Sequence, residues 1–181
     1  MKRARSRAKP LDAARLEELA LTYVARFATS TAKLERYLAR KVRERGWEGE
    51  SEPPVAALVE RYAALGYVDD ALFARSRAGS LLRRGYGPRR IGQALAEAGI
   101  AEEIREEARP SEAAERRAAL ALARKRRFGP FAPEPVDRER REKQLAAMLR
   151  AGHRLDTARE IVDAASEEAA ERWAEECDEE A

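Results

Sequence analysis

Cysteine is nearly absent from this 181-residue sequence, in which Cys177 is the only one. A disulfide framework is therefore excluded, and a reducing compartment is expected. Aromatic residues make up only 6% of the chain, so the core has to be built from alanine, leucine and valine. β-Branched residues are few and never alternate with polar ones, so no strand is predicted. These absences favour an all-helical protein made of several small units.

Long apolar runs are missing as well. No stretch approaches the roughly 18 apolar residues of a membrane span. The basic N-terminus is not followed by the apolar run that a secretory signal requires. We therefore expect a soluble, cytoplasmic protein that does not contact a membrane.

Groups that could carry catalysis or hold a metal are also scarce. His153 is the only histidine, and with a single distant cysteine the usual zinc spacings cannot be met. GYGPRR, residues 85–90, lacks the Gly-Lys-Ser/Thr of a phosphate-binding P-loop and follows a helix instead of a strand. Helix capping explains Asp69 and Asp70 without a metal. We therefore expect no enzymatic activity, no cofactor and no metal, and a helix-end position for His153.

Charge, by contrast, is abundant: charged residues make up 38% of the chain, and its two ends differ in sign. Residues 1–15 hold six basic groups and one acid, whereas residues 167–181 hold eight acids and one arginine. A basic head with an acidic tail points to a polyanionic partner. A separate hypothesis is that the tail folds back on basic residues and competes with that partner.

Apolar residues recur at helical spacing along most of the chain. Each predicted helix is bounded by capping side chains, glycine or proline. The predicted helices contain Leu16–Phe27, follow Ser30 up to Gly46, run from Val55 to Leu65, follow Asp69 or Asp70 up to Gly85, and run from Pro88 to Gly99. Further helices are expected around Ile104, after Ser111, after Asp137 up to Gly152, and after Asp156 toward Trp173.

A repeat organises these helices. The pairs Leu34/Leu38, Ile91/Leu95 and Leu145/Leu149 recur at separations of 57 and 54 residues. Ser30 and Gly87 match at the preceding turn, and Gly99 and Gly152 match at the following one. Since a three-helix unit buries little alone, we expect an elongated, curved array of tandem three-helix repeats. The predicted organisation is a disordered basic arm at 1–11, three-helix repeats at 12–66, 67–109 and 110–165, and an acidic C-terminal tail at 166–181.

Basic clusters fall at equivalent places in the second and third repeats. Arg83 and Arg84 end one helix, Arg89 and Arg90 begin the next, and no acid lies between them. Such clusters either form a solvated turn or bind phosphates and carboxylates, and we favour binding. The neighbouring aromatics either stack on bases or pack at a helix corner. The predicted binding edge comprises Arg83, Arg84, Tyr86, Arg89, Arg90, Arg124, Lys125, Arg126 and Arg127.

Residues 58–100, LVERYAALGYVDDALFARSRAGSLLRRGYGPRRIGQALAEAGI, resemble the bacterial RecX family of regulatory proteins. The resemblance is carried by the GYVDD-x-x-F-A step, the RGYGPRRI turn and the L-x-x-x-G-I ending, in that order. It covers about residues 20–105 strongly and 110–165 more weakly, where FGPFAPEP at 128–135 departs from the usual compact turn.

The resemblance implies a curved array of three-helix repeats that binds the recombinase RecA in the groove of the RecA–DNA filament. It also implies inhibition of the filament's ATPase, strand exchange and coprotease activities, within DNA repair, recombination and the SOS response. Single- or double-stranded DNA is implied as a weaker partner on its own, no catalytic residue is carried over, and a monomer is expected. The alternative is a general DNA-binding helical protein that acts without RecA and whose affinity falls steeply with salt.

Overall fold

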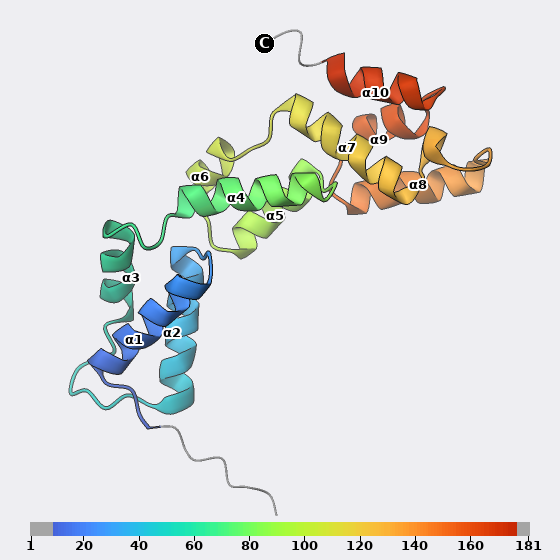
Figure 1. Ribbon diagram of the computed structural model, residues 1–181. Coiled ribbons are helices and arrows are strands. Elements are labelled where there is room, and N and C mark those ends of the chain that lie inside the picture. Colours follow the sequence, from blue (N-terminus) through green and yellow to red (C-terminus); the bar gives the residue numbers. More distant parts are fainter. Residues whose placement is uncertain (1–8, 177–181) are drawn as a thin grey trace, which may run out of the picture. The chain divides into compact units, whose positions relative to one another are not determined.

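The computed structural model describes residues 9–176, which are helical apart from loops and one isolated β-bridge (Figure 1). The predicted all-α fold is therefore confirmed. The helices are α1 (Ala13–Arg26), α2 (Thr31–Arg45), α3 (Val55–Ala64), α4 (Asp70–Arg83), α5 (Pro88–Glu97), α6 (Glu102–Glu107), α7 (Glu112–Arg126), α8 (Arg138–Arg150), α9 (Leu155–Val162) and α10 (Glu167–Glu175), with a short 3₁₀ turn at Gly129–Phe131.

The chain forms two compact units. Unit 1 takes in residues up to 73 together with 98–100, and unit 2 takes in residues 74–97 together with those from 101 onward. The division into three repeats stays a prediction.

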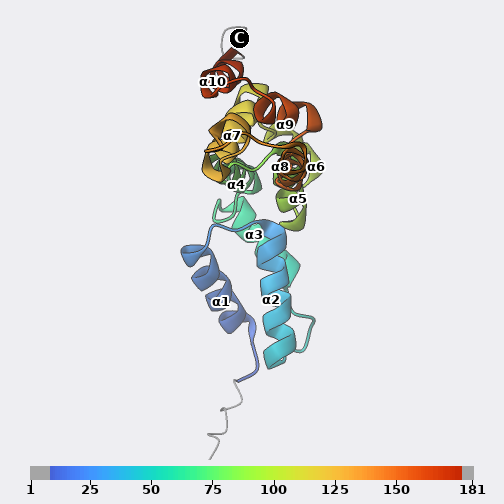
Figure 2. The same cartoon turned by 90° about the vertical axis from the view of Figure 1, so that its right-hand side faces the viewer.

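Unit 1 is built on α1 and α2, which lie side by side, with α3 packed on α2 (Figure 1 and Figure 2). Asp12 and Ser30 cap the first two helices by accepting hydrogen bonds from the backbone N–H groups of Arg15 and Lys33. Such caps satisfy donors that a helix N-terminus leaves open. The apolar faces predicted from helical spacing supply the buried core, which comprises Leu11, Leu16, Ala20, Leu34, Leu38, Leu58, Val59, Tyr62 and Val68.

The prediction that residues 1–11 form a disordered arm was wrong at its end. Leu11 is fully buried. Its N–H donates to the Gly46 carbonyl and its carbonyl accepts from the Glu48 N–H, both at 2.9 Å. A leucine directly before a capping aspartate can reach the core of α1 and α2, which explains the difference. The rest of the arm up to residue 8 lies outside the described residues.

Both candidate caps of α4 are used, in different ways. Asp69 accepts from the backbone N–H of Leu72 at 2.8 Å and caps α4. Asp70 instead accepts from the N–H and the hydroxyl of Thr31, at 2.8 and 2.7 Å. Asp69 therefore caps a helix and Asp70 holds the start of α2. These two structural roles account for the acidic pair.

Unit 2 is centred on α7, which α9 and α10 contact. Its core is rich in alanine, so helix axes can approach closely. The main cluster comprises Ala119, Leu120, Leu122, Ala123, Leu145, Met148, Ala158, Ile161, Val162, Ala170 and Ala174.

The C-terminal region differs from the prediction of one helix followed by an acidic tail. Helix α9 begins after Arg154, so Asp156 lies inside its first turn instead of capping it. A separate helix, α10, is capped by Ser166 and buries Ala170 and Ala174. This helix was missed for two reasons. Its buried residues are alanines, which give a weak hydrophobic signal, and acidic residues are frequent in its sequence. Residues 177–181, with Cys177, lie outside the described residues.

Candidate functional site

The predicted basic turn, residues 85–90, is held by close backbone packing within unit 2. Gly85 has φ +82°, and a Cβ placed there would lie 2.9 Å from the Leu122 Cβ on α7. The Gly87 N–H donates to the Ala151 carbonyl at 2.9 Å. Only glycine fits both a left-handed backbone and so close an approach. The turn is therefore fixed between α7 and the segment that joins α8 to α9.

His153 forms a hydrogen bond with the backbone of this turn. Its side chain is fully buried in the segment between α8 and α9, and its Nε2 lies 3.0 Å from the Gly85 carbonyl oxygen. A carbonyl only accepts, so Nε2 carries the proton and Nδ1 is unprotonated. Burial lowers the pKa of His153, against a smaller opposite effect of the Gly85 carbonyl. His153 is thus neutral and holds this turn in place. Its position near a helix end was predicted, but its contact with Gly85 was not.

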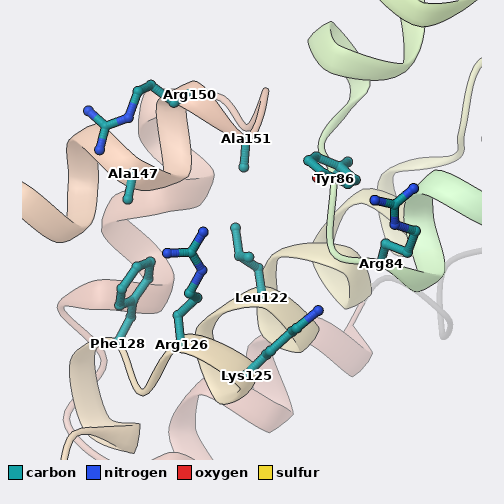
Figure 3. A pocket seen from close by; sticks show the side chains of 9 residues that line it. All are labelled: Arg84, Tyr86, Leu122, Lys125, Arg126, Phe128, Ala147, Arg150 and Ala151. Carbon is teal, nitrogen blue, oxygen red and sulfur yellow. The ribbon is translucent and has the colours of Figure 1, made fainter. Parts of the chain in front are cut away.

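The basic clusters meet around a surface hollow of about 280 Å³. We define the basic hollow by its cations Arg84, Lys125, Arg126 and Arg150 and by the ring of Tyr86 (Figure 3). Its apolar lining comes from Leu122, Phe128, Ala147 and Ala151. Residues from two predicted clusters, separated by about forty positions in sequence, therefore share one site.

Three helix C-termini present these cations. Arg84 follows the last residue of α4, Lys125 and Arg126 lie in the last turn of α7, and Arg150 ends α8. Partial negative charge at a helix C-terminus favours cations there. The helix ends therefore favour these cations at the surface, although no carboxylate of residues 9–176 pairs with them.

The electrostatics of the basic hollow are unbalanced. All four cationic side chains are exposed, and within residues 9–176 none lies within ion-pairing distance of a carboxylate. The Arg84 guanidinium lies 5.2 Å from the centre of the Tyr86 ring, which orients it. Planar guanidinium groups with unused donors suit phosphates and carboxylates. The basic hollow can therefore bind a polyanion.

The other predicted residues lie elsewhere. Arg89 lines a second hollow, together with Arg105, Arg109 and Arg154. Arg124 is ion-paired with Glu171 of α10 and lies over the Phe131 ring, 5.7 Å from its centre. Three exposed arginines line neither hollow: Arg83, Arg90 and Arg127.

Arg150 was missed by sequence reasoning. It is an isolated arginine at the end of α8, and no local cluster marks it. The repeat offered a signal, since Arg150 directly precedes Ala151 and Gly152, the turn that matches Ala98 and Gly99. Arg150 reaches the basic hollow because that turn docks on residues 85–90, and this docking cannot be read from the local sequence.

Other kinds of site find no support in the described part of the chain. Residues 9–176 contain no group of three or more histidine, cysteine or acidic side chains placed to hold a metal ion. Among the helices of this same region, none combines the length and the apolar character that crossing a membrane needs.

Comparison with known proteins agrees with the resemblance in the central stretch. A family model described as RecX, second three-helix domain, matches residues 69–108. The chain is 35% identical over 157 residues to the regulatory protein RecX of Myxococcus xanthus (strain DK1622), covering 82% of this chain and 84% of that relative. It is 34% identical to the regulatory protein RecX of Halorhodospira halophila (strain DSM 244 / SL1), covering 74% of this chain and 80% of the relative.

Solved structures share the fold. A crystal structure of RecX from Lactobacillus salivarius superposes with a TM-score of 0.63 at 19% identity, covering 80% of this chain and 90% of that one. A second crystal structure, of a regulatory protein RecX, gives a TM-score of 0.64 at 21% identity, covering 82% and 70%. With its helical fold, its glycine-held basic turn and relatives matched over most of their length, this chain belongs to the RecX family of regulatory proteins.

Proposed function

We propose that this chain regulates the RecA recombinase by binding in the groove of the RecA–DNA filament. In that position it modulates, and typically inhibits, the ATPase, strand exchange and coprotease activities of the filament. Membership of the RecX family supports a regulatory role, since the relatives are named regulatory proteins.

The observation that carries the proposal is the basic hollow. Its four cations lack a carboxylate within the described residues, so their charge is available to phosphates of DNA or to acidic groups of a protein filament. An exposed cation is screened over about 8–10 Å at physiological salt, so the partner has to reach the hollow itself. A large, negatively charged assembly meets this requirement.

The test is a titration of RecA-dependent ATP hydrolysis on single-stranded DNA. Changing Arg84, Lys125, Arg126 and Arg150 together to alanine removes the charge of the hollow, and inhibition should be lost while helicity is kept. The matched control changes four exposed arginines outside the hollow to alanine, and it should inhibit like the unmodified protein. That control comprises Arg75, Arg77, Arg138 and Arg140. Equal inhibition by both variants would place the contact with the filament elsewhere.

A DNA-only binding measurement separates this proposal from a general DNA-binding protein. A filament regulator inhibits at low ratios to RecA although it binds naked DNA weakly. A protein that acts through DNA alone inhibits only at concentrations that coat the DNA, and its affinity falls steeply with salt.

A further inference from the structure

Three aromatic rings form a column on α1 and α2 of unit 1. The Tyr37 and Tyr23 rings are stacked, with centroids 4.1 Å apart and an angle of 18° between their planes. Phe27 follows Tyr23, with centroids 5.3 Å apart at an angle of 48°. At the other end, Arg40 and Lys41 lie over Tyr37, 5.7 and 5.8 Å from the ring centre. The column is thus closed by cations at one end and ends in Phe27 at the other.

Phe27 is the open end of this column. Tyr23 and Tyr37 pack against the core of unit 1, whereas Phe27, at the C-cap of α1, is 55% exposed. The fold therefore uses two of the rings for packing and leaves the third in solvent. A further planar group can stack on Phe27 and extend the column, since offset stacking of aromatic rings is favourable.

The segment of sequence that carries the column has an excess of basic residues. Residues 21–43 contain six lysines and arginines and a single acid, Glu35. Arg40 and Lys41 share the carboxylate of Glu44, at 3.6 and 2.8 Å, so part of this charge is balanced. With Glu44 included, residues 21–44 still hold six basic and two acidic residues. Its ligand should therefore combine planar groups with repeated negative charge.

We propose that the column Tyr37–Tyr23–Phe27 is a stacking site for an unpaired base of single-stranded nucleic acid. Single strands offer free base faces and a phosphate at every step, whereas a duplex hides its base faces. Aromatic rings beside cations are the usual means of holding a single strand without regard to sequence. This site lies in unit 1, is separate from the basic hollow, and does not depend on contact with RecA.

The test compares two fluorescently labelled strands by anisotropy, using the full chain. One is a thymidine oligonucleotide of about 15 nucleotides, the upper end of common site sizes. The other is an abasic strand of equal length, which has the same phosphates but no bases. Phe27→Ala should weaken binding of the thymidine strand by about 10- to 100-fold and leave binding of the abasic strand unchanged. Phe27→Trp should restore binding.

Leu21→Ala is the matched control, because Leu21 is 49% exposed on the same helix and is not part of the column. It should bind both strands like the unmodified protein. The proposal is overturned if Phe27→Ala binds the thymidine strand normally, or if it loses affinity for both strands equally. Thermal unfolding of Phe27→Ala should be unchanged, since the ring is outside the core. These results are independent of the ATPase titration, because RecA is absent.

Discussion

The backbones of Gly87 and Gly152 are in direct contact: a Cβ on Gly87 would lie 2.5 Å from the carbonyl carbon and oxygen of Gly152. The same relationship recurs in unit 1, where Ser30 takes the place of Gly87 and Gly99 that of Gly152. There the Ser30 hydroxyl donates to the Ala98 carbonyl at 2.6 Å, and a Cβ on Gly99 would lie 2.3 Å from that of Ala32. One kind of turn-to-turn docking is therefore used twice.

Alanine at Gly87 or Gly152 should destabilise unit 2. The new methyl group would overlap backbone atoms, which cannot rotate away as a side chain can, and Gly152 also has φ +95°. Overpacking costs about 1–3 kcal/mol, and the loss should be larger at Gly152 because of its backbone conformation. Chemical denaturation measures the free energy of unfolding.

Gly92→Ala is the control for these glycine variants. Gly92 lies inside α5, and a Cβ there would meet no atom within 4 Å. Alanine should therefore stabilise the helix by about 0.5–1 kcal/mol. If all three alanines destabilise the protein equally, close backbone packing is not the reason for Gly87 and Gly152.

Ser30→Ala should cost more than removal of an ordinary helix cap. Ser30 is fully buried, and its hydroxyl both caps α2 and donates to Ala98. Losing a cap costs about 1 kcal/mol, and leaving a buried carbonyl unpaired costs about 1–3 kcal/mol more. Ser111→Ala removes a cap alone from the exposed start of α7, so the difference between the two unfolding free energies isolates the buried bond. Equal losses would contradict its importance.

His153 should make stability fall as the pH drops below about 6.5. The unfolded chain takes up a proton on histidine below about pH 6.5, while burial lowers the pKa of His153 in the folded chain. The unfolded state then holds more protons, so stability falls as pH falls through this range. Asp163 contributes only at lower pH, because the hydrogen bond from Arg141 lowers the pKa of its carboxyl.

His153→Gln separates this effect from general acid unfolding. A glutamine amide can still donate to Gly85 but does not titrate. The variant should lose the fall in stability that begins below about pH 6.5, even if it is less stable than the unmodified protein at pH 7. An unchanged slope in urea denaturation at several pH values would assign the dependence to another group.

The sequence was sufficient for most helices because their ends carry clear signals. Ser30, Asp69, Ser111 and Asp137 cap the helices that were predicted to follow them, and Asp12 caps the first helix, for which no capping residue was predicted. It was insufficient for α10, whose inner face is alanine.

The candidate site could be predicted only in part. Arg84 and Lys125 were found as members of dense basic runs, yet their meeting depends on the fit of Gly85 against Leu122. Arg124 was grouped with them. It directly precedes Lys125 on α7, however, and its side chain pairs with Glu171 instead of facing the basic hollow. Local sequence thus reveals charge density, whereas helix rotation and docking decide which charges face the same ligand.

The ion pair between Arg124 and Glu171 gives the hypothesis of a competing acidic tail a specific form. Deletion of residues 167–181 is not a suitable test, because it would remove Ala170 and Ala174 from the core of unit 2. Glu171→Gln instead releases Arg124 and keeps the helix. Since half-exposed pairs are worth about 0–1 kcal/mol, stability should change little.

The released Arg124 can then neutralise one more phosphate. Binding of a single strand to Glu171→Gln should tighten at low salt, and the slope of log affinity against log salt should steepen by about 0.7. Glu175→Gln makes the same change in net charge at an exposed position of α10, and among residues 9–176 no ion pair joins Glu175 to Arg124. It should raise affinity weakly and leave the slope unchanged. If both variants behave alike, net charge alone governs binding, and Glu171 does not compete with the polyanion for Arg124.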